Sequence, residues 1–412
     1  MKNILIKNIK GLVGILEENS TALRGAELAE LQSIENAFLT IEDGKISFYG
    51  SMDDMEGITD WRNLEIIDAE GKFVLPAFCD SHTHIVFAAS REGEFVDRIN
   101  GLTYEEIGQK GGGILNSAQK LANMSEDDLF EGAMQRLELI KKWGTGAIEI
   151  KSGYGLSVAS ELKMLRVIKR LKNESDLTIK ATFLGAHSFP ANYKNNKDGY
   201  VDLVINEMLP KIKAENLADY IDVFCERNYF TAEQLDRILK AGVAVGLKPK
   251  IHVNQFSIMG GVEVGIKHHA VSVDHLEELG ENDIKALQKS NTIATALPSC
   301  SFFLNIPYSP VKKMIENNIA IALATDFNPG STPSGNMQFV NSLACVKMRL
   351  TPQQALNATT INGAYAMEVE EELGSITIGK KANLIITKKM PSLAYMAYSF
   401  GENCVEQTLT FK

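Results

Sequence analysis

Two histidines, His82 and His84, are separated by a single residue and follow an apolar run at residues 73–78. If that run is a β-strand, residues two apart point to the same face, so both imidazole rings aim at one point just past the strand end. Neutral imidazole is the commonest side-chain metal ligand at neutral pH. The pair is therefore a candidate for half of a metal site. A single His-x-His pattern is weak evidence, so the rest of the chain must supply the other ligands.

The elements that would position these histidines begin near residue 71, where apolar strand-like runs start to alternate with amphipathic helical stretches. Near-continuous hydrophobicity is typical of strands that are buried on both faces of a parallel sheet. Eight such runs predict an α/β fold, a TIM-like (β/α)8 barrel, which usually takes about 250 residues plus insertions. The runs lie at residues 73–78, 146–150, 179–184, 220–224, 250–253, 270–273, 292–296 and 319–324.

Short β-rich segments flank the predicted barrel on both sides. Alternating segments with turn signals precede it, and the chain returns to short β segments after about residue 366. We expect the two ends to join in one small composite β-sandwich domain. The predicted organisation is a β-rich segment at 1–75, a metal-dependent hydrolase barrel at 76–366 and a C-terminal β segment at 367–412. The glycine run at 111–113 is more often a plain connector than a lid over a site.

Polar side chains gather at the predicted strand ends, which is where the active site of a (β/α)8 enzyme lies. Histidines scattered through a core or a surface would rarely do this, although a single one would more often be structural. We assign His268 and His269, just before the sixth run, to such a structural role. The other five of the seven histidines fall at strand ends: His82, His84, His187, His252 and His275.

His82, His84, His252 and Asp326, which follows the eighth run, together make a good ligand set for one metal ion. Their nitrogen and oxygen atoms suit Zn²⁺ or Fe²⁺ and leave a position for water. A metal ion lowers the pKa of such a water toward neutrality. Asp326 can accept the water's proton, and His275 can orient the water or hold a developing oxyanion. The pattern predicts metal-dependent hydrolysis, with His275 and Asp326 as catalytic residues.

Composition narrows the class of protein. The 412 residues are 45% apolar and 23% charged, which are ordinary values for a globular protein. A net charge of −10 argues against a nucleic-acid-binding surface and gives no attraction to an anionic membrane. Five widely spaced cysteines indicate reduced thiols, and no apolar run is long enough to cross a bilayer. We expect a soluble, cytoplasmic protein that acts on a small molecule.

Longer motifs identify a family. His82-Thr-His84, a fifth-strand His252, a sixth-strand His275 and an eighth-strand Asp326 resemble the amidohydrolase superfamily with a single metal. The strings at residues 90–95, 151–156, 183–187, 222–226, 324–331 and 400–403 look like those of the imidazolonepropionase family. This resemblance implies hydrolytic opening of the 4-imidazolone-5-propanoate ring to N-formimidoyl-L-glutamate in histidine degradation. It also implies one zinc or iron ion per subunit and a homodimer.

The resemblance also assigns substrate contacts. Arg91 and Tyr104 match the positions that hold the propanoate carboxylate, for which a guanidinium is well suited. Tyr154 and His187 match positions that contact the ring. The family's contacts to the product-like end of the ligand fall on Asn328, Gly330 and Ser331. Taken singly, each of these residues would read as a solvated arginine, a packed aromatic ring or a simple Asn-Pro-Gly turn.

Gln255 separates this chain from many deaminases of the superfamily. Those enzymes carry His-x-x-Glu after the fifth strand, whereas this chain reads His252-Val-Asn-Gln255. An amide has no titratable proton near neutral pH, so it can hydrogen-bond the substrate ring but cannot act as a general acid. We therefore place Gln255 among the catalytic and substrate-binding residues of a hydrolase, and its presence counts against a deaminase.

Two other hypotheses remain open at this point. One is a related amidohydrolase or deaminase that acts on another small carboxylate-bearing heterocycle; Arg91 and Tyr104 argue for an acidic substrate, because a neutral nucleobase would give them no carboxylate to bind. The other is a non-catalytic metal-binding or scaffold protein, which is disfavoured because all four predicted ligands and His275 are present together.

Overall fold

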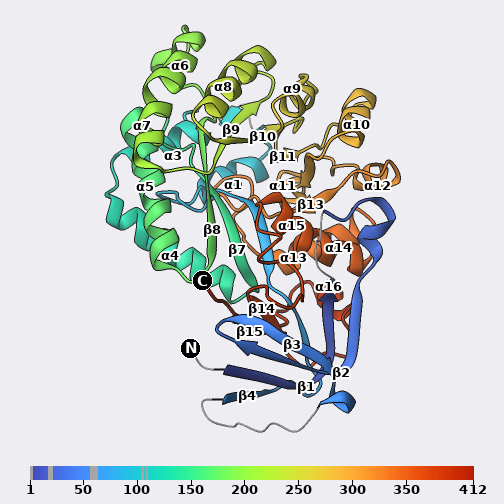
Figure 1. Cartoon of the computed structure of the whole chain (residues 1–412). Helices are drawn as coiled ribbons and strands as arrows, with labels where there is room; N and C mark the ends of the chain where they lie inside the picture. The colour runs from blue at the N-terminus through green and yellow to red at the C-terminus, as the bar shows by residue number, and fades with distance from the viewer. Residues whose placement is uncertain (1–2, 17–21, 56–63, 104–105, 108–109) are drawn as a thin grey trace.

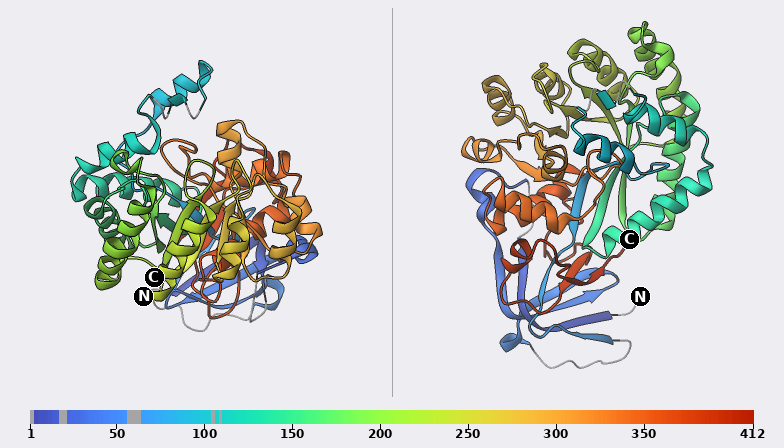
Figure 2. Two further views of the ribbon diagram at one scale, coloured as in Figure 1. Left: turned by 90° about the horizontal axis from the view of Figure 1, so that it is seen from above. Right: turned by 180° about the vertical axis from the view of Figure 1, so that it is seen from behind.

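Eight parallel strands form a barrel around which the site is built. The computed structural model describes residues 3–16, 22–55, 64–103, 106–107 and 110–412. The strands follow one another in sequence order, from β6 to β13, with helices packed around them (Figures 1 and 2). They are β6 (Phe78–Thr83), β7 (Thr145–Lys151), β8 (Thr178–Ala186), β9 (Tyr220–Cys225), β10 (Lys248–Val253), β11 (Ser272–His275), β12 (Ile293–Ala296) and β13 (Ile321–Leu323).

The segment after β13 closes the barrel against β6. The backbone N–H of Asp326 donates to the carbonyl of His82 at 3.0 Å, and the N–H of His84 donates to the carbonyl of Phe327 at 2.8 Å. This seam lays Asp326 directly beside the two histidines, although the residues are more than two hundred positions apart in the chain.

The sequence explains where the surrounding helices form, as one example shows. In α4 (Glu126–Lys141), the Ser125 hydroxyl caps the start by accepting the N–H of Asp128. Its buried residues, which include Leu129, Ala133, Leu137 and Ile140, recur at the three- and four-residue spacing of one helix face. The other helices are α1 (Glu92–Ile99), α3 (Gly113–Ala122), α5 (Val158–Glu174), α6 (Lys197–Leu203), α7 (Leu209–Glu215), α8 (Ala232–Ala244), α9 (Gly261–Lys267), α10 (Glu281–Gln288), α11 (Pro298–Leu304), α12 (Val311–Glu316), α13 (Met337–Val346), α14 (Pro352–Thr359), α15 (Ile361–Ala366) and α16 (Tyr395–Tyr398).

A second sheet lies below the barrel in Figure 1 and joins the two ends of the chain. It is one mixed sheet of seven strands, in which β1 pairs with β4 and β5 in parallel and with β2 in antiparallel orientation. The predicted class, a (β/α)8 barrel with a small composite β domain drawn from both termini, is confirmed; the strands of this domain form one mixed sheet, where the two packed sheets of a β-sandwich were expected. The strands of the sheet are β1 (Asn3–Ile15), β2 (Gln32–Glu42), β3 (Lys45–Ser51), β4 (Leu64–Asp68), β5 (Phe73–Pro76), β14 (Leu384–Thr387) and β15 (Val405–Leu409).

The first predicted strand is wrong in its bounds. The run at 73–78 is divided between β5 of the small sheet and β6 of the barrel. The division falls at Ala77, whose N–H donates to the carbonyl of Asn383, whereas the N–H of Phe78 donates to the carbonyl of Gly144. One continuous apolar run therefore serves two sheets in succession. As a result, His82 lies within its strand instead of past the end of it.

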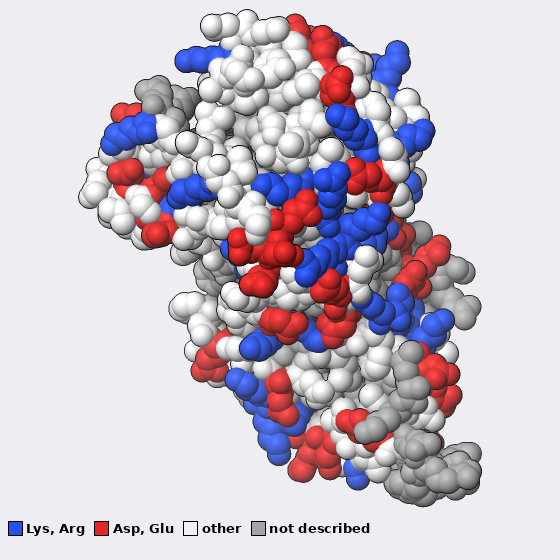
Figure 3. Space-filling model, turned by 90° about the vertical axis from the view of Figure 1, so that its left-hand side faces the viewer, with Lys and Arg blue, Asp and Glu red and all other residues white. Residues whose placement is uncertain are grey.

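The surface carries charges of both signs. Lysines and arginines lie interspersed with aspartates and glutamates over the face shown in Figure 3. Among the helices of the described residues, none combines the length and the apolar character that a membrane span requires. All five cysteines lie in the described part of the chain, and none of them forms a disulfide.

Candidate active site

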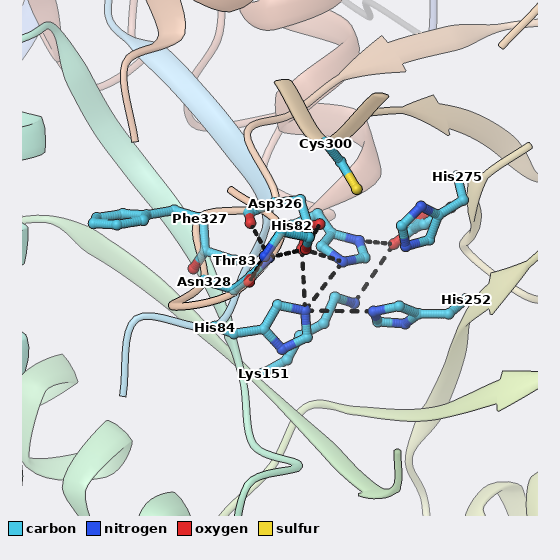
Figure 4. Close-up of polar contacts among 12 residues, drawn as sticks. His82, Thr83, His84, Lys151, His252, His275, Cys300, Asp326, Phe327 and Asn328 are labelled. Atoms are coloured by element: carbon cyan, nitrogen blue, oxygen red, sulfur yellow. Dashed lines mark hydrogen bonds and ion pairs between the residues drawn. The ribbon is translucent and has the colours of Figure 1, made fainter. Parts of the chain in front are cut away.

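Three histidine nitrogens converge at the carboxyl end of the barrel. The Nε2 atom of His84 lies 3.3 Å from that of His82 and 3.4 Å from that of His252 (Figure 4). The potential ligand atoms of these three residues all lie within 4.8 Å of one another. Two nitrogens bound to one zinc ion at about 2.0–2.1 Å in tetrahedral geometry are separated by about 3.4 Å. The spacing therefore fits a single ion held by three imidazoles.

The protonation of two of these rings is fixed by carboxylates behind them. Nδ1 of His82 lies 2.7 Å from Oδ2 of Asp274, and Nδ1 of His252 lies 2.8 Å from Oδ2 of Asp222. An ionised carboxylate only accepts hydrogen bonds, so each Nδ1 carries the hydrogen and each Nε2 keeps a lone pair. Lone pairs brought this close repel one another unless a cation lies between them, so the donor set fits a metal ion.

Asp326 completes the cluster from the opposite side of the barrel seam. Its Oδ1 lies 3.4 Å from Nε2 of His84 and 3.6 Å from Nε2 of His82. Burial alone would raise the pKa of Asp326, but its hydrogen bond to His84 and the neighbouring histidines hold that pKa below the ordinary value. Its backbone adopts a left-handed conformation, with φ of 56°. The carboxylate is therefore ionised and available as a fourth ligand.

A buried ionic network lies beneath the histidines, and the sequence analysis missed it. Lys151 Nζ lies 2.7 Å from Glu149 Oε1, 2.9 Å from Asp222 Oδ2 and 3.5 Å from Asp274 Oδ2. Lys250 contacts the other oxygen of Glu149 at 2.8 Å, and the side chains of all five residues are fully buried. Although burial lowers the pKa of Lys151, the three carboxylates raise it more strongly, so the amine stays charged. The lysine thus connects the two carboxylates that orient His82 and His252.

The pKa values of these histidines agree with a metal-binding role. Burial lowers the pKa of His82 and of His252 well below the ordinary value, and the charge of Lys151 lowers both further. Both rings are therefore neutral at physiological pH, which is the form that binds a metal. The pKa of His275 moves in the other direction, because the Glu277 carboxylate and other acidic neighbours outweigh the effect of burial.

A pocket opens directly above the cluster, and its empty volume of about 480 Å³ includes space that is open to solvent. The apolar residues in its lining are Ile114, Phe224, Phe256 and Leu304. The predicted site residues that line it are His84, Arg91, Tyr154, His187, His252, Gln255, His275, Asp326, Asn328 and Ser331.

The structure describes only one of the two residues that were predicted to bind a carboxylate. Arg91 is 9% exposed and lines the pocket, and its Nε donates to Oε2 of Glu94 at 3.0 Å. Tyr104 lies outside the described residues.

Gly330 does not line the pocket but lies against Arg91, where an added Cβ would come within 2.1 Å of Nη2. A side chain at position 330 would therefore displace the guanidinium of Arg91 from its present position.

Asn328 organises the loop that contains Gly330 and Ser331. Its Oδ1 accepts the N–H groups of both residues at 2.8 Å, and its Nδ2 donates to the carbonyl of Asp326 at 2.7 Å. Ser331 in turn donates to Oδ2 of Asp326 at 3.2 Å. The turn that the sequence suggested as an alternative is thus present, and it fixes the metal-site aspartate.

Tyr154 and His187 form an aromatic wall beside the cluster. The His187 ring stacks on His84 with centroids 5.4 Å apart, and Tyr154 lies 5.5 Å from His187. The loop that carries Tyr154 is held by Glu161 of α5, whose carboxylate accepts the N–H groups of Gly153, Gly155 and Leu156. Glu161 is fully buried. Sequence reasoning missed this residue, because an acidic residue in an amphipathic helix normally faces solvent.

Gln255 lines the pocket and lies on a loop that the carboxylate of Glu226 holds in place. Its Nε2 donates to Sγ of Cys300 at 3.4 Å. The next two backbone N–H groups donate to Oε2 of Glu226, at 2.9 Å from Phe256 and 3.2 Å from Ser257. Asn254, directly before Gln255, has φ of 57°, a left-handed conformation that asparagine tolerates better than most residues.

Comparison with known proteins relates the chain to one enzyme family. Residues 73–410 match the model of the amidohydrolase family. The chain is 57% identical to an imidazolonepropionase of Flavobacterium johnsoniae, with 98% of each chain covered. It is 40% identical to an imidazolonepropionase of Thermoanaerobacter pseudethanolicus, with 100% of this chain and 97% of the relative covered.

Solved structures support the same fold at lower sequence identity. E. coli guanine deaminase superposes with a TM-score of 0.73 at 14% identity, covering 100% of this chain and 98% of that one. An adenosine deaminase of Xanthomonas campestris with bound zinc gives a TM-score of 0.71 at 14% identity, covering 99% and 91%. These similarities concern the fold alone.

Proposed function

The chain belongs to the amidohydrolase family and, within it, to the imidazolonepropionases, and we infer that it hydrolyses the ring C–N bond of 4-imidazolone-5-propanoate to give N-formimidoyl-L-glutamate in histidine degradation. The full-length similarity to curated imidazolonepropionases carries this assignment. The lining of the pocket supports it, because a buried arginine and the histidine cluster face the same pocket.

We propose that His82, His84, His252 and Asp326 hold one zinc or iron ion. Three converging imidazole nitrogens and an ionised carboxylate support this ligand set. When bound, such an ion supplies Lewis acidity, which lowers the pKa of water and polarises a carbonyl oxygen. The carboxylates of Asp222 and Asp274 keep two of the three rings in the tautomer whose Nε2 faces the centre.

The substrate is oriented by residues around the rest of the pocket. The Arg91 guanidinium binds the propanoate carboxylate, together with Tyr104 by family resemblance. Glu94 supports this role because it holds Nε of Arg91 and so fixes the plane of the guanidinium. Tyr154 and His187 pack against the ring, and Asn328 and Ser331, which line the same pocket, contact the ligand from the loop that contains Gly330.

Asp326 and His275 act on the attacking water. Asp326 Oδ accepts one proton of the water and returns it to the ring nitrogen that is released when the C–N bond breaks, and Nε2 of His275 orients the water by accepting its other hydrogen. Gln255 hydrogen-bonds the substrate ring without changing its own protonation, since an amide does not titrate near neutral pH. Proton transfer therefore takes place at the end of the pocket where Asp326 and His275 lie.

Three broader features are also part of this proposal. We place the chain in the cytoplasm, which the five unpaired thiols support. We expect a homodimer by family resemblance. The division into segments 1–75, 76–366 and 367–412 is retained as a domain assignment, and the joining of both chain ends in one sheet supports it.

The test is turnover of 4-imidazolone-5-propanoate by purified, metal-replete protein, followed by loss of the ring's ultraviolet absorbance. We expect rapid loss with the parent and none with His252→Ala. Arg91→Met should raise KM about 10- to 100-fold, because a hydrogen bond to a charged group contributes about 1.5–3 kcal/mol. Arg237→Met, which changes an exposed arginine on α8, is the matched control and should leave KM unchanged. No absorbance loss with metal-replete parent protein would contradict the assignment.

A further inference from the structure

The backbone around His275 is strained in a way that directs its ring. His275 has φ of 87° and Leu276 has φ of 63°, so two consecutive residues with side chains adopt left-handed conformations. Such conformations are unfavourable for residues with side chains and persist only where the surroundings enforce them. Here Ser309 donates to the carbonyl of His275 at 2.6 Å, and the N–H of Leu276 donates to the carbonyl of Val253 at 3.2 Å. The fold therefore holds this ring at a defined place beside the histidine cluster.

Glu277 lies beside the Nδ1 atom of this ring. Both of its carboxylate oxygens are 3.5 Å from Nδ1 of His275, and its side chain is 1% exposed. Ser301 of α11 donates to Oε1 at 3.2 Å, whereas Oε2 has no hydrogen-bond donor among the described residues. Burying a carboxylate is costly unless it is paired. Glu277 is therefore placed where the imidazole of His275 offsets the cost of its burial.

We propose that Glu277 is a positioning residue for the hydrolysis: it accepts the Nδ1 hydrogen of His275, fixes the plane of the ring and leaves Nε2 as the atom presented to the substrate. This inference rests on the proposed function, since it assigns a task to His275 in that reaction. It parallels the arrangement at His82 and His252, where a carboxylate also holds Nδ1.

The competing interpretation is structural. Glu277 could serve only to anchor α11 through Ser301, or it could form a second cation site. Donor atoms of His275, Glu277 and Cys300 lie within 4.8 Å of one another, so the three could hold an ion in principle. An anchoring role predicts loss of stability without dependence on His275. A second cation site predicts two metal ions per chain instead of one.

A double-mutant cycle between Glu277 and His275 distinguishes these possibilities. We expect Glu277→Leu to lower kcat about 10- to 100-fold with KM within about twofold, the range found when a partner that orients a functional side chain is removed. Glu277→Gln should retain most activity, because its carbonyl oxygen can still accept the Nδ1 hydrogen. In a His275→Ala background, adding Glu277→Leu should change kcat less than about twofold. Glu278→Gln is the control, since the adjacent Glu278 is exposed.

A second measurement needs no substitution at Glu277. Nitrogen-15 NMR of histidine-labelled protein, with the His275 signals assigned by their absence from His275→Ala, should show a hydrogen on Nδ1 of His275. A bare Nδ1 would overturn the proposal, even if Glu277→Leu failed to fold. Equal losses of kcat in both backgrounds, or two metal ions in the parent and one in Glu277→Leu, would also overturn it. No turnover by the parent would instead refute the proposed function, so the two failures are distinguishable.

Discussion

Lys151 offers the sharpest test of how the buried network supports the site. We predict that Lys151→Met destabilises the protein strongly, although the residue lies outside the pocket and methionine nearly matches its length. Lys151 and Lys250 balance Glu149, Asp222 and Asp274, all of them without solvent exposure. With all five ionised, removal of Lys151 changes their net charge from −1 to −2 in the barrel interior.

The size of the effect follows from burial. Removing one partner of a buried ion pair typically costs about 3–5 kcal/mol, because the remaining charge is left unpaired in a low dielectric. Proteins unfold with an entropy of about 2.1 cal/mol/K per residue near 60 °C, so for 412 residues this cost corresponds to a fall in Tm of about 3–6 °C. The matched control is Lys172→Met. Lys172 lies 3.4 Å from Asp219, but the two side chains are 46% and 31% exposed, so its loss should cost at most about 1 kcal/mol.

The assay is thermal unfolding followed by circular dichroism, in excess chelator. Chelator is needed because metal binding to the folded state would otherwise add its own stabilisation and obscure the network. We expect Lys151→Met to unfold several degrees below the parent and Lys172→Met within about 1 °C of it. A Lys151→Met protein with the parent's Tm would refute the argument that this lysine compensates the buried carboxylates.

Two further predictions address the carboxylate and the loop that support the site. Asp222→Asn should weaken metal binding about 10- to 100-fold, because Asp222 accepts hydrogen bonds from both the backbone N–H and Nδ1 of His252. Competition with a chelator measures the metal affinity, and an affinity equal to that of the parent would contradict the prediction. Gly155→Ala should lower both Tm and kcat/KM, because the added Cβ would lie 2.4 Å from the backbone nitrogen of Glu161 and displace the Tyr154 loop. Gly401→Ala, where an added Cβ meets nothing within 4 Å, is its control in the same unfolding and turnover assays, and equal effects of the two substitutions would contradict the steric argument.

The positions of the predicted ligands are within reach of sequence reasoning because they depend on local rules. A strand alternates its side chains, and the carboxyl ends of parallel barrel strands meet at one face. These two rules are enough to predict that His82, His84 and His252 lie together, and their nitrogens do lie within 4.8 Å of one another in the folded chain. Asp326 follows from the same strand-end rule, and the seam after β13 fixes its position beside His82 and His84.

The supporting residues are harder to predict because their partners come from distant segments. Glu161 reads as an ordinary surface residue of α5 until the loop at residues 153–156 is seen to fold over it. Glu277 reads as the first of two adjacent acidic residues, and the left-handed turn at His275 brings its carboxylate beside Nδ1 of the ring. The same limit explains the error at residues 73–78, where hydrophobicity could not reveal the change of sheet at Ala77.

One signal for the network is nevertheless present in the strands themselves. The runs were interpreted as continuously apolar, yet β7 alternates Ile148 and Ile150 with Glu149 and Lys151. The same alternation recurs around Asp222 in β9, around Lys250 and His252 in β10 and around Asp274 in β11. In a (β/α)8 barrel, alternate residues point outward to the helices and inward to the axis. The apolar positions therefore pack on the helices, and the polar positions form stacked layers that rise to the metal-binding cluster. In this chain the polar interruptions of an apolar strand, more than the strand itself, indicate where the chemistry lies.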